Sequence, residues 1–242
     1  NNGTFIAYCF HSVTGYSKFG SYTGNGSATG TSVTTGFRPA FLMIKKLGVA
    51  NWLMFDSSRS DSIVTDIGEN MHADSTRAEA SNASSAIKVD FNATSFQLKG
   101  TSADFNGNGD EYVYMCFAGG ADAVSTVNTT GSIDSRVKAN PTYGQSIVKY
   151  IGTSGVSDAT KVGHGLSAAP EMIIIRDYNN AQYWPVWHHE MHADGGFDRK
   201  MYLNDAGAVT GTDQRRVTSV SSTTFGLPEG ASSGGYSESN HI

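Results

Sequence analysis

The chain repeats its own sequence once, at an offset of about 130 positions. Three pairs of landmarks carry the repeat: Pro39 and Pro170 (131 positions apart), Trp52 and Trp184 (132 apart), and Phe96 and Phe225 (129 apart). A repeat at a fixed offset constrains the fold strongly, because both copies must form the same unit. The 242 residues therefore predict two domains of similar architecture.

Strand patterns dominate each copy. The runs 41–44 and 172–175 are continuous and apolar, with Pro upstream and Lys or Arg downstream, as in central strands buried on both faces. Residues 87–91 and 96–99 alternate between apolar and polar side chains, as in strands with one wet face. Charged residues make up only 16% and Gly is frequent, at 28 residues, which suits a turn-rich chain. We predict an all-β fold of two tandem antiparallel β-sandwiches, jelly-roll or concanavalin-A-like.

The repeat is out of phase with the chain. The strand predicted for 112–118 closes the first copy, and its best match is residues 5–11. The second copy reaches Ile242 where its own closing strand should begin. We expect a first sandwich over 1–118, a linker and the strand leading into the second copy over 119–144, and a second sandwich over 145–242 without its closing strand. The chain is then interpreted as a fragment of a longer tandem array or a processed product.

An unfilled strand position exposes a sheet edge and one side of an apolar core, and both favour aggregation. We therefore expect a strand to fill this position in the second copy. Three sources remain open: residues 5–11 of the same chain, residues 5–11 of a neighbouring chain, or sequence beyond Ile242. Deleting residues 1–11 is expected to change stability or assembly state if this segment is the source.

Composition excludes some partners. The net charge is −5 and basic residues are scattered, whereas nucleic-acid binding needs clustered Lys and Arg. No apolar run approaches the roughly 20 residues that a transmembrane helix needs, so we expect no membrane span. Cys9 and Cys116 occupy the same position in successive copies, and each is predicted to be a buried free cysteine. The polar, turn-rich profile favours a virion or extracellular protein.

Five segments together resemble a known module: 16–26, 36–41, 112–118, 131–141 and 162–174. They are similar to a tandem repeat of large structural and fibre-like proteins of marine tailed phages, including phages of cyanobacteria. That resemblance implies a lectin-like, concanavalin-A-like sandwich located in a virion. It implies a non-enzymatic structural or adhesion module, of the tail-fibre or capsid-decoration kind, that associates with other virion proteins or with copies of itself. Host-surface glycans are its candidate ligands. Fold alone does not establish this function.

Two alternatives are a carbohydrate-active depolymerase and a free glycan-binding lectin. A glycosidase needs paired carboxylates at a characteristic separation, and we find no such strand motif, no Gly-x-Ser-x-Gly elbow and no phosphate-binding Gly loop. No catalytic residue is therefore assigned. Aromatic faces can stack on sugars. Trp52 and Trp184 are repeat equivalents and are predicted to lie in the cores, whereas Trp187 and Tyr183 are predicted to be exposed and are the candidate glycan-binding residues.

A candidate calcium loop lies before the closing strand of the first copy. Asp104, Asn106, Asn108 and Asp110 place oxygen ligands at alternate positions, but a strand follows where an EF-hand has its helix. Asn-Gly pairs are also the strongest hairpin signal, so Ca²⁺ and a simple turn both remain open.

Histidines offer a second candidate metal site. His188 and His192 could share a metal if their segment were helical, although an extended chain is expected there. Isolated histidines such as His164 are interpreted as structural.

Overall fold

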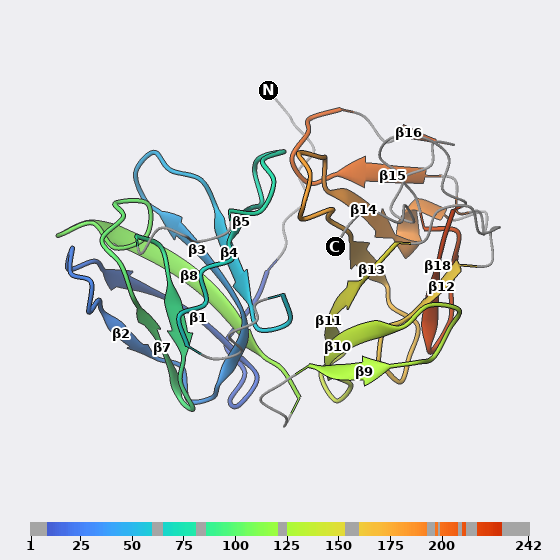
Figure 1. Ribbon diagram of the computed structural model, residues 1–242, viewed down its shortest axis with the longest axis horizontal. Coiled ribbons are helices and arrows are strands. Elements are labelled where there is room, and N and C mark those ends of the chain that lie inside the picture. Colours follow the sequence, from blue (N-terminus) through green and yellow to red (C-terminus); the bar gives the residue numbers. More distant parts are fainter. Residues whose placement is uncertain are drawn as a thin grey trace.

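The structure is a computed structural model in which two all-β repeats lie side by side (Figure 1). It describes residues 9–59, 65–80, 86–120, 125–152, 160–192, 197, 199–207, 210–211 and 217–228. Over these residues every regular element is a strand except one short 3₁₀ helix, His189–His192. None of the helices in the described part of the chain could cross a bilayer.

The first repeat, blue to green in Figure 1, is built from two antiparallel sheets. The five-stranded sheet has the order β1-β8-β3-β4-β5, and its strands are β1 (Ser17–Thr23), β8 (Glu111–Ala118), β3 (Pro39–Lys46), β4 (Leu53–Asp56) and β5 (Met71–His72). The three-stranded sheet has the order β2-β7-β6, with β2 (Ser32–Thr34), β7 (Ser95–Leu98) and β6 (Val89–Phe91). The predicted all-β sandwich architecture is confirmed.

The second repeat, yellow to red in Figure 1, divides its strands among three antiparallel sheets. One has the order β11-β10-β9, with β11 (Gln145–Tyr150), β10 (Ser135–Asn140) and β9 (Thr126–Asn128). Another has the order β13-β14-β15-β16, with β13 (Met172–Ile174), β14 (Pro185–His188), β15 (Arg199–Tyr202) and β16 (Thr210–Gly211). The last has the order β12-β18-β17, with β12 (Thr160–Gly163), β18 (Thr224–Leu227) and β17 (Ser219–Val220).

The core of the first repeat follows from strict alternation along β8. Tyr112, Tyr114 and Cys116 are buried and point into the sandwich, while the residues between them are more exposed. Phe96 of β7 is fully buried on the opposing sheet, and its ring meets the ring of Tyr114 edge-on at 5.1 Å. The period-two alternation of a strand places every second side chain of β8 in this core.

Strand β8 is an interior strand of this sheet, with a paired neighbour on each side. It pairs on one edge with β1, where Cys116 lies opposite Lys18. On its other edge it pairs with β3, where Cys116 lies opposite Leu42. The backbone groups of β8 are therefore satisfied on both sides, and the sheet is continuous from β1 to β5.

The corresponding sheet of the second repeat is interrupted. Gly15 and Gly144 both adopt positive φ, at 75° and 73°, in the turns before β1 and β11. Tyr22 and Tyr150, at the ends of these strands, are each followed two positions later by Gly, so β11 corresponds to β1. The Pro landmarks align β13 with β3. These two strands are neighbours of β8 in the first repeat, but β11 and β13 belong to separate sheets in the second.

This interruption corrects one prediction. The run 172–175 was expected to be buried on both faces, yet Met172 and Ile174 are 45% and 44% exposed. Among the described strands, β13 pairs with β14 alone, so no described strand covers its other edge. The equivalent run in β3 is covered because β8 lies beside it.

The N-terminal segment is described from residue 9 onward, so residues 5–8 lie outside the described residues. Phe10 stacks on Phe19 of β1, with the ring centroids 5.7 Å apart, and the backbone N–H of Phe19 donates to Ser12 Oγ at 3.1 Å. Cys9 is exposed, which corrects its predicted burial, whereas Cys116 is a buried free cysteine as predicted. Burial raises the pKa of the Cys116 thiol to about 12, so this thiol stays protonated and unreactive at neutral pH.

Hydrogen bonds join the two repeats through one loop of the first. The Arg176 guanidinium donates to the carbonyl oxygens of Thr76 and Arg77 at 2.9 and 2.6 Å. Trp184 Nε1 donates to the carbonyl oxygen of Ser75 at 3.1 Å. The backbone N–H of Glu79 donates to the Tyr178 carbonyl at 2.7 Å. Loop 75–79, part of the stretch in which the two copies differ most in sequence, is thus a connection between them.

Candidate functional site

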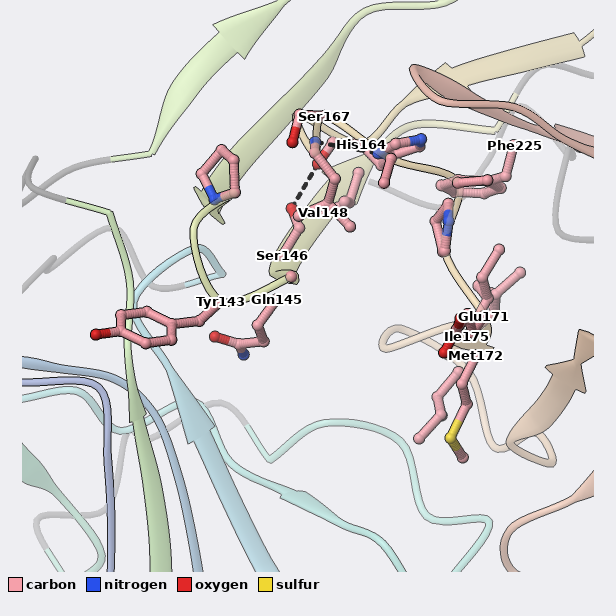
Figure 2. Close-up of a pocket in the computed structure, with 18 of the residues that line it drawn as sticks. Tyr143, Gln145, Ser146, Val148, His164, Ser167, Glu171, Met172, Ile175 and Phe225 are labelled. Atoms are coloured by element: carbon pink, nitrogen blue, oxygen red, sulfur yellow. Dashed lines mark hydrogen bonds between the residues drawn. The ribbon is translucent and has the colours of Figure 1, made fainter. Parts of the chain in front are cut away.

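The most distinctive site is the opening between β11 and β13, which we call the strand slot. It is a cavity of ≈ 640 Å³. Figure 2 shows Gln145, Ser146 and Val148 on one side and Met172 and Ile175 on the other, with open space between them. The two walls are the strands that would flank a counterpart of β8.

The floor of the strand slot belongs to the core of the second repeat. Val148 and Tyr150 of β11 pack against this core, as does Ile173 of β13. Phe225 of β18 is only 4% exposed and also lines the cavity. The slot is therefore apolar at its base and carries backbone donors and acceptors on its two strand walls.

His164 fixes one end of the slot (Figure 2). It is 2% exposed. Its Nδ1 accepts a hydrogen bond from the backbone N–H of Leu166 at 3.1 Å, so the proton lies on Nε2, which is 3.2 Å from the carbonyl oxygen of Ser221. The carbonyl of His164 accepts from Ser146 Oγ at 2.6 Å. The ring bonds Leu166 and Ser221 and the main-chain carbonyl bonds Ser146, which agrees with the interpretation of His164 as a structural histidine.

The protonation of His164 is expected to destabilise the second repeat. Burial lowers the pKa of His164 below its usual 6.5, so the unfolded chain binds this proton more readily than the folded chain. Stability is then full above about pH 6.5 and falls as the pH drops from there toward the folded pKa. Urea unfolding between pH 8 and pH 5 measures this loss.

A His164→Gln variant keeps an acceptor and a donor and should unfold with less pH dependence than the wild type over this range. His72 of the first repeat, whose pKa is also lowered by burial, requires the parallel His72→Gln control. An equal pH dependence in the wild type and His164→Gln would contradict the assignment.

A second cavity, the inter-repeat cleft of ≈ 530 Å³, adjoins the slot. From the first repeat it is lined by apolar side chains on the outer face of the five-stranded sheet: Phe41, Met43, Met54, Met115 and Phe117. From the second repeat it is lined by residues that also line the slot, including Ser146, Val148 and Met172. The slot thus opens toward an apolar face of the first repeat.

A buried ion-pair network borders the cleft. Arg59 Nε contacts Asp56 Oδ2, and Arg59 Nη1 contacts Glu79 Oε1, with the three side chains only 7%, 8% and 12% exposed. Asp56 Oδ1 also accepts from the backbone N–H of Ser58 at 2.9 Å. Lys149 Nζ of β11 donates to the Arg59 carbonyl oxygen at 3.4 Å. Nothing in the sequence pattern predicted this network, because Glu79 is 20 positions from Arg59 in the sequence.

The two residues predicted to bind glycans differ in exposure. Tyr183 is 39% exposed and its ring lies 4.9 Å from that of Tyr202. Trp187 is only 6% exposed, and it stacks on Phe197 at 5.8 Å, so its predicted exposure is wrong. Trp187 lies opposite Ile173 on the inner side of β14.

The two tryptophans predicted to lie in the cores, Trp52 and Trp184, differ in burial. Trp184 is buried, as predicted, whereas its repeat equivalent Trp52 is 39% exposed. The difference has a tertiary cause, since Trp184 contacts the loop of the other repeat through Nε1. Repeat equivalence therefore does not guarantee equal burial.

The candidate calcium loop is organised by its own side chains. Asn106 is fully buried, and its Nδ2 donates to the carbonyl oxygens of Gly100 and Ser27 at 2.8 and 3.0 Å. Its Oδ1 accepts from the backbone N–H of Asn25 at 3.0 Å. Lys46 Nζ lies 2.7 Å from Asp110 Oδ2, whereas Asp104 and Asn108 are exposed. The amide of Asn106 and the carboxylate of Asp110 are engaged with protein partners, which favours the turn over the calcium site.

Asn106→Asp distinguishes these two interpretations. A carboxylate cannot donate the two bonds of Nδ2, so we expect a loss of about 2–3 kcal/mol in the unfolding free energy of the first repeat. Millimolar Ca²⁺ should not restore it. The measurement is urea denaturation with and without CaCl₂, and Asn108→Asp at an exposed position is the matched control. A Ca²⁺-dependent gain in stability in Asn106→Asp would instead support a metal site.

Of the predicted metal pair, the structure describes the side chain of His188, while that of His192 lies outside the described side chains. His188 ends β14 and His189–His192 forms the 3₁₀ helix. The His188 and His189 rings stack at 5.1 Å, and His189 Nε2 lies 2.8 Å from Glu190 Oε1. Across the described residues no three His, Cys, Asp or Glu side chains converge as metal ligands.

The fold and site define a class: a tandem β-sandwich protein in which, over the described residues, β11 and β13 of the second copy are separated by a cavity. The chain belongs to the family described as "Domain of unknown function (DUF7483)", which matches it twice, over residues 1–121 and 119–242. The two matches cover the two repeats inferred from the sequence. No curated protein and no solved structure matches the chain.

Proposed function

We propose that the chain is a non-enzymatic structural and adhesion module of a virion, of the tail-fibre or capsid-decoration kind, present in multiple copies. The observation that carries this is the junction between the repeats. Arg176 and Trp184 of the second repeat hydrogen-bond to main-chain carbonyls of loop 75–77. These acceptors are main-chain carbonyls, so the contact between the two repeats does not depend on the side chains of the loop. Such a contact suits a structural module that holds neighbouring domains at a fixed distance.

Two further features support the same proposal. Three of the titratable side chains that line the cavities are held by protein partners: His164 by Leu166 and Ser221, Asp56 by Arg59, and Asp177 by Asn180. The sequence also resembles repeats of fibre-like proteins of marine tailed phages. Other virion proteins, further copies of the chain and host-surface glycans are the partners consistent with this role.

The test incubates the purified chain with host envelope preparations and with marine polysaccharides. It measures retention on the surface and release of reducing sugar. We expect retention without turnover. Sugar release abolished by a single Asp or Glu substitution would overturn the proposal in favour of a depolymerase.

Tyr183→Ala separates a free lectin from a structural module, because Tyr183 is the exposed member of the predicted glycan pair. Saturable binding to one defined sugar that is lost in Tyr183→Ala, but kept in the control Tyr143→Ala at another exposed tyrosine, would favour the lectin. Retention that both variants preserve supports a structural attachment role.

A further inference from the structure

The first repeat shows what the strand slot of the second repeat is shaped to hold. Strand β8 lies between β1 and β3 and pairs with each over nearly its whole length. Their counterparts β11 and β13 flank the slot. A strand inserted there would satisfy the free edges of two sheets and join them into one sheet, as β8 does.

The side chains around the slot define what an incoming strand must carry. Val148, Tyr150 and Ile173 face the core, so every second residue of the guest must be apolar. The other face of the guest would meet the inter-repeat cleft, where Met172 and Ile174 are exposed. Both faces of the guest are therefore apolar or aromatic, a demanding pattern that β8 itself meets.

Residues 5–11 have this pattern. Aligning Cys9 with Cys116 places Phe10 on Phe117 and Ile6 on Val113, and Phe5 falls on Tyr112. We propose that the strand slot is a receptor for a β-strand and that residues 5–11 of a second copy of the chain occupy it. This inference is independent of the proposed virion role.

The described N-terminal residues indicate which molecule supplies the guest. Phe10 stacks on Phe19 of β1 with the ring centroids 5.7 Å apart, and Cys9 is exposed. Neither residue lines the strand slot of its own molecule, so we assign the guest strand to a second molecule. The contact is heterologous, so successive chains join head to tail.

The register follows from the equivalence with β8. Cys116 lies opposite Lys18 and Leu42 in the first repeat. The inward-facing positions that correspond in the second repeat are Ser146 on β11 and Ile173 on β13. Cys9 of the guest should therefore lie opposite Ser146 and Ile173, and Ala7 should lie opposite Val148 and Ile175.

The first experiment measures binding in trans. The full chain carrying Ala7→Asp, which weakens its own segment as a competing guest, is titrated into a labelled wild-type peptide of residues 1–12, and fluorescence anisotropy is recorded. Saturable binding is expected, because the peptide supplies both edge hydrogen bonds and inward apolar groups. The same peptide with Ala7→Asp places a carboxylate in the core and should bind at least about tenfold more weakly. Equal binding of the two peptides, or none by either, would overturn the proposal.

The second experiment identifies the donor molecule. The full chain with Ile173→Cys is oxidised under mild conditions and run on a non-reducing gel, and Val127→Cys on the exposed edge strand β9 is the control. Disulfide-linked dimers and longer ladders with Ile173→Cys, absent in the control and after Cys9→Ser, support insertion between chains. A disulfide-linked monomer would show that the same chain closes its own slot and would overturn the intermolecular proposal. No Cys9-dependent product at all would exclude this register and likewise overturn it.

Discussion

Replacing Arg59 by Met is expected to lower the unfolding free energy of the first repeat by about 3–5 kcal/mol. Arg59 contacts both Asp56 and Glu79, and all three side chains are nearly buried. Removing the guanidinium leaves two carboxylates without their counter-charge in a poorly solvated site, and this penalty exceeds the packing that Met restores. Urea denaturation followed by tryptophan fluorescence and circular dichroism measures the change.

A matched control is the pair of Lys99 and Asp90, whose charged atoms are 3.7 Å apart with the Lys99 side chain 34% exposed. Lys99→Met should change stability by about 1 kcal/mol or less, because exposed ion pairs contribute little. The double variant Arg59→Met with Asp56→Asn should recover part of the loss, since one uncompensated charge is removed. An Arg59→Met effect no larger than that of Lys99→Met would contradict the burial of the network.

The second large effect is expected from a matched pair of core substitutions. Phe96→Ala should destabilise the first repeat by about 3–5 kcal/mol. Its ring is fully buried and makes edge contacts with Tyr22 and Tyr114 at 6.1 and 5.1 Å. The closed sandwich has no space into which it can relax, so a cavity remains.

Phe225→Ala, the repeat-equivalent change, should cost less than Phe96→Ala. Phe225 is also buried, but it already lines the strand slot, so part of its surface faces open space and fewer contacts are lost. Because two repeats need not unfold in one step, each transition is fitted separately. The addition of the 1–12 peptide should enlarge the Phe225→Ala effect, since a filled slot completes the packing around the ring. Equal losses for Phe96→Ala and Phe225→Ala would contradict an open slot.

The predictions for Arg59 and for Phe96 and Phe225 both concern how the two repeats are arranged. The Arg59 network and the loop at residues 75–79 bring the repeats together, and the apolar outer face of the first five-stranded sheet then faces the open side of the second repeat. A strand entering the slot would contact both repeats at once. The affinity of such a strand would therefore depend on the junction between the repeats as well as on the slot walls.

The sequence alone was enough to establish the repeat, the all-β class and the positions of most strands. The reason is that alternation and Pro, Gly and Asn-Gly signals act locally, within a few residues of where they are read. Phe96 and Leu98 could be assigned to the core of the first repeat on that basis, and they are buried there.

Only the tertiary structure decided which aromatic side chains are exposed and where the sites lie. Trp187 is buried because Phe197, ten positions away, folds back onto it, and Trp52 is exposed although its equivalent Trp184 is held by the other repeat. The sequence makes Asn106 a candidate metal ligand, whereas in the structure its amide donates to the carbonyl oxygens of Gly100 and Ser27. Burial, ion pairing and the width of the slot depend on contacts between residues far apart in the chain, and no local pattern encodes those contacts.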